Sequence, residues 1–102
     1  METKDIRLEI KIWGSILDCQ IFLENNQQVG FWAYNSSKKV YFKELKMYEI
    51  DGGILDVKML CRGKNGAKAS LLLKIEGQLD ENLICEILDG KSIIEKSINI
   101  LS

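Results

Sequence analysis

A two-residue alternation of apolar and polar side chains runs through much of this sequence and constrains its fold more than any other feature. It is clearest in residues 6–12, where isoleucine or leucine alternates with charged residues, and it recurs in residues 16–24, 55–62 and 69–76. This period places alternate side chains on opposite faces of a β-strand, whereas an amphipathic helix repeats about every 3.6 residues. We therefore expect half-buried strands. The side chains expected to face the core are Ile6, Leu8, Ile10, Ile12, Leu17, Cys19, Ile21, Leu23, Leu55, Val57, Met59, Cys61, Ala69, Leu71, Leu73 and Ile75.

The aromatic residues concentrate between Val29 and Phe42. An apolar run at 29–34 leads into the polar residues 35–39 and then into a second β-rich run. This pattern predicts a strand, a turn and a return strand. Because both faces of the first run are apolar, we expect it to be a central strand that is covered on both sides. The second run, with residues 45–50, is expected to form one bent strand or two short ones.

Turn signals separate these strands. A double glycine at 51–53 indicates a turn, because glycine adopts positive φ freely. Residues 62–66 are expected to form a hairpin loop with its tight corner at Asn65 and Gly66. Short strands joined by short turns are typical of a sandwich. The sequence predicts an all-β, immunoglobulin-like antiparallel β-sandwich of seven or eight strands.

The C-terminal part of the chain permits two interpretations. Residues 82–101 fit a hairpin with a type I′ turn at Asp89 and Gly90. A helix is also possible, since Ser92 and Glu95 match a capping box. The isoleucine content favours strands. We expect residues 1–102 to form a single domain with its core in 5–77 and this hairpin packed on the core.

Composition argues against several classes of function. The net charge of −1 gives no reason to expect a nucleic acid or a membrane as partner. Histidine is absent, so the common general base, the Ser-His and Cys-His pairs and the commonest zinc ligand are missing. The carboxylates form no focused acid–base pair in the sequence. We expect no enzyme, no cofactor and no metal site.

The expected location of the chain is cytoplasmic. The sequence has neither a signal-peptide pattern nor an apolar run of the ~20 residues that cross a bilayer. If the chain is a fragment of a larger protein, a cell-surface or secreted location becomes possible.

Two segments resemble a known family of domains. Residues 29–37 (VGFWAYNSS) place aromatic side chains before a polar turn, and residues 56–66 (DVKMLCRGKNG) follow farther along. Both are similar to immunoglobulin-like bacterial accessory domains of the three-Tyr, two-component-regulator type, and the resemblance covers residues 6–76. Val29 replaces the first tyrosine of the family pattern, and Ser37 replaces its turn glycine. The resemblance implies a spacer or recognition module in bacterial surface or polysaccharide-related proteins, or beside an enzyme.

Three residues also follow the order of the immunoglobulin Cys–Trp–Cys set, namely Cys19, Trp32 and Cys61. We expect them on the strands where that set lies, although Met59 occupies the position of the tyrosine-corner residue. Two interpretations remain open. The cysteines are either buried free thiols that act as small apolar side chains, or a bridge in an oxidising compartment.

The expected function is that of a non-catalytic accessory or interaction domain that binds a protein or a neighbouring domain. The alternative is a carbohydrate-binding module with an aromatic platform around Trp32 and Tyr34, since sugar rings stack on aromatic faces. We expect Trp32 and Tyr34 to form an outer apolar group with leucines of neighbouring strands, covered by the C-terminal hairpin or by a partner. The candidate binding residues are Trp32, Tyr34, Leu60, Leu72, Tyr41 and Tyr48.

Overall fold

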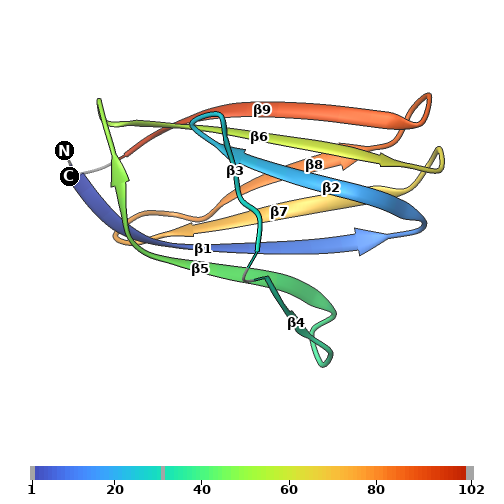
Figure 1. The fold of residues 1–102 in the computed structure, drawn as a ribbon, viewed down its shortest axis with the longest axis horizontal. Helices are drawn as coiled ribbons and strands as arrows, with labels where there is room; N and C mark the ends of the chain where they lie inside the picture. The colour runs from blue at the N-terminus through green and yellow to red at the C-terminus, as the bar shows by residue number, and fades with distance from the viewer. Residues whose placement is uncertain (1, 31, 101–102) are drawn as a thin grey trace.

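The computed structural model describes residues 2–30 and 32–100, and within them the chain forms nine strands and no helix (Figure 1). The strands are β1 (Glu2–Trp13), β2 (Ile16–Leu23), β3 (Asn26–Gln27), β4 (Ala33–Asn35), β5 (Val40–Ile50), β6 (Ile54–Gly63), β7 (Lys68–Ile75), β8 (Glu81–Glu86) and β9 (Lys91–Asn99).

These strands form two antiparallel sheets. One sheet has the order β4-β5-β1-β7-β8, and the other has the order β3-β2-β6-β9. Figure 1 shows them as two layers of roughly aligned strands. The predicted all-β sandwich is confirmed, but the described residues form nine strands where seven or eight were expected.

The core lies between the sheets and consists of the side chains that the alternation placed inside. Strands β6 and β7 bury alternate residues almost completely, and β1 does so from Ile6 to Ile10; Leu8, Met59 and Leu71 are 0% exposed. Burying one such side chain stabilises the fold by about 1.5–3 kcal/mol. Ile12 and Cys19 are only partly buried but still pack against this core.

The inward position expected for Leu17 is wrong, because its side chain is 83% exposed. The pairing of β2 with β6 shifts between Ile16 and Asp18, so β2 has one extra residue there. Such a bulge reverses the alternation on one side of the irregularity. Ile16 packs against the core instead.

The aromatic run does not form a central strand. Within the described part of the chain, β4 has three residues and pairs with β5 alone, at the edge of its sheet. Val29 lies outside any strand and is 65% exposed, and residue 31 lies outside the described part. The cause is topological: this stretch carries the chain from one sheet to the other, and Gly30 adopts a φ of 74° in the connection.

The tight corner expected at Asn65 and Gly66 is present, and the Ala67 N–H donates to the carbonyl of Lys64 across it at 3.1 Å, although Arg62 and Gly63 still belong to β6. The hairpin expected around this turn is wrong, because β6 and β7 belong to different sheets. Gly63 permits the crossing, since a Cβ there would lie 2.4 Å from the carbonyl oxygen of Ser15. Of the two alternatives expected for residues 39–42 and 45–50, one bent strand or two short ones, the structure shows the first, because β5 is continuous from Val40 to Ile50.

The C-terminal part forms strands and not a helix. Asp89 and Gly90 both have positive φ, and Leu88 and Lys91 exchange backbone hydrogen bonds around them, as the two-residue turn predicts. The strands then separate: β8 pairs with β7, and β9 pairs with β6 in the other sheet. The expectation that residues 82–101 form a hairpin packed on a core made by residues 5–77 is therefore wrong, because each of the two strands joins a different sheet. Residue 101 lies outside the described part. The tail instead buries Leu83, Cys85, Ile87, Ile98 and Ile100.

In the described part of the chain, no helix has the length and apolar character needed to cross a membrane.

The bulge in β2 predicts different costs for two leucines that simple alternation treats alike. Leu23→Ala should destabilise the fold by about 2–5 kcal/mol, because Leu23 is fully buried. Leu17→Ala should change the stability by no more than about 0.5 kcal/mol. Urea unfolding of both variants measures this difference, and equal losses would contradict the bulge.

Candidate functional site

The structure does not bring the six candidate binding residues together. Leu60 on β6 pairs with Gln20 and Ile93, in an outward-facing register on one sheet. Leu72 on β7 pairs with Glu9 and Asn82, on the outer face of the other sheet. The two leucines therefore lie on opposite faces of the sandwich, because the turn at 62–66 changes sheets.

Trp32 helps to close one side of the sandwich. Its ring is partly buried against the core, and its indole N–H donates to the carbonyl of Gln28 at 2.9 Å. Beside it, Lys43 faces inward on β5 and is buried, and its Nζ donates to the carbonyl of Val29 at 3.2 Å. Backbone carbonyls of the connection from β3 to β4 thus accept hydrogen bonds from the side chains of Trp32 and Lys43. The sequence did not indicate that Lys43 faces inward, because lysine is expected on the exposed face of a strand.

Tyr34 and Tyr41 are the two candidates that the structure does bring together. They face each other across β4 and β5, with ring centroids 4.7 Å apart and ring planes inclined by 52°. Tyr34 is 52% exposed and Tyr41 is 44% exposed. The β4–β5 hairpin that carries them extends beyond the two-sheet body (Figure 1).

The tip of this hairpin has a defined conformation. The side-chain oxygen of Asn35 accepts a hydrogen bond from the backbone N–H of Lys38 at 3.1 Å, and Lys39 adopts a φ of 57°. Both lysines are exposed. The hairpin therefore presents two half-exposed phenol rings on its strands and two cationic residues at its turn.

Tyr48 lies near the far end of β5 and is not part of this group. It packs partly against the core, and burial together with the nearby Glu24 raises its pKa. Burial and the neighbouring carboxylates of Asp51 and Asp56 raise the pKa of Glu24 in turn. Among the described residues, no group of histidine, cysteine or acidic side chains could hold a metal ion.

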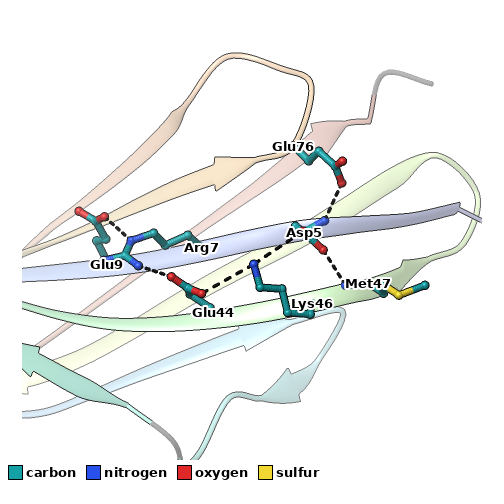
Figure 2. A network of polar contacts seen from close by, with 7 residues as sticks. All are labelled: Asp5, Arg7, Glu9, Glu44, Lys46, Met47 and Glu76. Carbon is teal, nitrogen blue, oxygen red and sulfur yellow. Dashed lines mark hydrogen bonds and ion pairs between the residues drawn. The ribbon is translucent and has the colours of Figure 1, made fainter.

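A network of charged side chains covers part of the outer face of the five-stranded sheet (Figure 2). Arg7 donates to Glu9 at 2.7 Å and to Glu44, and its guanidinium lies 4.4 Å from the centroid of the Phe42 ring. Lys46 lies 3.8 Å from carboxylate oxygens of both Glu44 and Asp5. Each carboxylate of this chain of contacts has a cationic neighbour.

One end of the network fixes the bend in β5. Asp5 accepts a hydrogen bond from the backbone N–H of Met47 at 2.9 Å, and Met47 has a φ of 52°. The register between β1 and β5 shifts at this point. Glu76 accepts from the backbone N–H of Asp5 at 3.0 Å and joins the turn after β7 to the same place. These contacts stabilise a bulge, because they occupy a backbone donor that has left the regular ladder.

Within the network, Glu9 is held in the ionised form. The hydrogen bond from Arg7 lowers the pKa of Glu9 and outweighs the opposing effect of burial. A general acid at neutral pH needs the opposite shift. This arrangement is therefore suited to fixing strand geometry.

The cysteines do not reproduce the immunoglobulin set. Cys19 and Cys61 face each other on adjacent strands of one sheet, whereas that set links two sheets. Trp32 lies on a connection and not on a strand. Both cysteines are free, and Cys85 on β8 is a third free thiol.

No protein-family model matches the chain, and no curated protein or solved structure shows significant similarity to it.

Another exposed aromatic residue, Trp13, lies outside the six candidate binding residues. Trp13 is 46% exposed at the end of β1 and lines a shallow groove of about 510 Å³ with Gly14, Gly66, Lys68 and Ile84. The sequence does indicate its exposure, because Trp13 continues the outward-facing alternate positions Arg7, Glu9 and Lys11 of β1.

The Arg7–Glu9 contact predicts a pH-dependent contribution to stability. Because the folded pKa of Glu9 is lowered, its contribution is present above the unfolded pKa and is lost as the pH falls through the folded value. Glu9→Gln should lower the stability at pH 7 by up to about 1 kcal/mol, and the difference should shrink below pH ~4.

Urea unfolding of both proteins at several pH values measures this trend. Glu49→Gln, an exposed change on β5, is the matched control and should show no such convergence. A constant difference for Glu9→Gln at all pH values would contradict the assignment.

Proposed function

We propose that this chain is a non-catalytic, immunoglobulin-like recognition domain that binds a protein or a neighbouring domain through its β4–β5 hairpin. The exposed Tyr34–Tyr41 pair carries the proposal. A spacer or recognition role was also what the resemblance to three-Tyr accessory domains implied, and that relationship remains part of the proposal.

The order of the strands supports an immunoglobulin-like relationship. In that fold, strands A, B, E and D form one sheet, and strands G, F, C and C′ form the other. Here β7-β1-β5-β4 correspond to the first set, and β9-β6-β2-β3 correspond to the second. Two differences remain. Strand β7 occupies the position of strand A but follows β6 in the chain, and β8 pairs with β7 as an additional strand at the edge of that sheet. Such sandwiches serve many functions, so the binding role rests on the hairpin.

The chemistry of the hairpin fits a protein partner. Tyrosine is enriched in protein interfaces, because a large ring with two rotatable bonds adds contact area at a small entropic cost. The paired rings restrict each other across the strands, and this arrangement preorganises them for binding. The lysines of the turn favour a partner with acidic groups beside an apolar contact.

Substituting the tyrosine pair should weaken binding without unfolding the domain. A photocrosslinking side chain introduced at position 34 should capture the partner in the source cells, whereas the same group at Leu79, exposed in another loop, should not. With the captured partner purified, Tyr41→Ala should weaken binding about tenfold or more, which corresponds to about 1.4 kcal/mol.

Leu79→Ala is the matched control and should bind like the wild type. Equal affinity of the Tyr41→Ala variant, with its fold intact by circular dichroism, would overturn the hairpin as the binding site.

A carbohydrate-binding role is the second candidate, and the groove beside Trp13 favours it. The ring is half exposed, while Gly14 and Gly66 place no side chains in the groove. Lys11 lies with its Nζ 5.5 Å from the ring centroid, as a polar neighbour for sugar hydroxyls. The tyrosine pair fits a sugar less well, because its inclined rings do not form one flat platform.

Tryptophan fluorescence separates the two candidates. If the groove binds a glycan, titration with a panel of oligosaccharides should give a saturable change that Trp13→Ala abolishes and Trp32→Phe retains. If none of the glycans changes the fluorescence of the wild type, the carbohydrate-binding role fails for that panel and the protein-binding proposal is unaffected.

A further inference from the structure

The three cysteines come from separate strands but face the same part of the core. Cys19 on β2 and Cys61 on β6 are direct partners in the antiparallel register, and their sulfur atoms lie 3.1 Å apart. Cys85 on β8 belongs to the opposite sheet, and its thiol lies 3.7 Å from the carbonyl of Met59. The chain thus places two thiols in contact and a third thiol nearby.

The backbone at Cys19 and Cys61 suits a covalent bond. Directly opposed residues of antiparallel strands have Cα atoms about 4.5 or 5.5 Å apart, depending on their hydrogen-bonding pattern. Disulfides span Cα distances of about 4.4–6.8 Å. Either pattern therefore allows the bond to form without separating the strands.

The two thiols differ in access. Cys61 is 0% exposed, whereas Cys19 is only partly buried near the end of the sandwich. Contact with Cys19 and burial raise the pKa of Cys61, and burial raises that of Cys85 to about 11. Cys19 is the thiol that a small molecule can reach, and the other two are held protonated inside.

We propose that Cys19 and Cys61 form a redox-active dithiol that a small disulfide, such as oxidised glutathione, converts to a cross-strand disulfide. The Cys19 thiolate attacks one sulfur of the reagent, forms a mixed disulfide and releases one thiol. Cys61 then loses its proton, and its sulfur attacks that of Cys19 and releases the second thiol. Two electrons and two protons pass from the protein to the reagent, which is reduced to two thiols.

The bond would form where the sheet is held least firmly. In the described residues, β3 pairs with only Phe22 and Leu23 of β2, so the preceding part of β2 has β6 as its one strand neighbour. A bridge there would fasten an edge strand to the middle of its sheet. It would also close a loop between residues that are 42 positions apart, and such a closure restricts the unfolded chain. This inference does not depend on the proposed binding function.

Oxidation of the folded protein tests the proposal. After incubation with oxidised glutathione and then alkylation in denaturant, the wild type should carry one adduct, whereas the reduced protein carries one on each of its three cysteines. Before alkylation its mass should be lower by about 2 Da, and a digest should contain the Cys19–Cys61 peptide pair. The midpoint of thermal unfolding should rise by on the order of 10 °C and return after reduction.

Two variants distinguish the proposed pair from other linkages. Cys85→Ser should oxidise like the wild type, and Cys19→Ser should show neither the mass change nor the shift in midpoint. Three unreacted thiols in the wild type, a bond that includes Cys85, or a bond only between two chains would each overturn the proposal. These outcomes are read on the wild type, so they hold even if a variant folds poorly.

Discussion

Contact between two apolar sheet faces is the interaction on which the rest of this structure depends. Strands β1, β6 and β7 contribute alternate side chains to one shared layer, in which Leu8, Met59 and Leu71 are completely withdrawn from water. Such a strand is not stable outside this layer, because its apolar face would then be in contact with water. The surface features are positioned by strands that this layer fixes in register.

Departures from the regular register give the protein its individual features. The bulge at Leu17 turns an apolar side chain outward, and the bulge at Met47 bends β5 where Asp5 accepts its backbone N–H. Because a one-residue slip reverses the two faces of a strand, a bulge alters which side chains are available at the surface. The charged network around Arg7 supports this geometry, since Asp5 and Glu76 accept the backbone N–H groups of Met47 and Asp5 at the bulge.

The surface proposed for recognition lies at the edge of the five-stranded sheet. On one side of the sandwich, Trp32 and Lys43 both donate hydrogen bonds to carbonyls of the connection between β3 and β4. The adjoining β4–β5 hairpin extends from the body and carries the tyrosine pair. The paired cysteines lie within the four-stranded sheet, so the proposed disulfide would change the strength of the scaffold and leave the hairpin as it is. The hairpin proposed for binding and the proposed disulfide therefore lie in separate parts of the molecule.

The sequence by itself determined the fold class, most of the core and the tight turns, because these depend on local periodicity and on glycine conformation. The inward residues of β1, β6 and β7 follow directly from alternation. Only the tertiary structure decided which strands are neighbours, since a turn at residues 62–66 or at Asp89–Gly90 is equally compatible with a hairpin and with a change of sheet. That choice placed Leu60 and Leu72 on opposite faces and brought Cys19 to Cys61 within one sheet. Pairing between distant strands depends on the burial of the whole layer, and no short segment of the sequence contains that information.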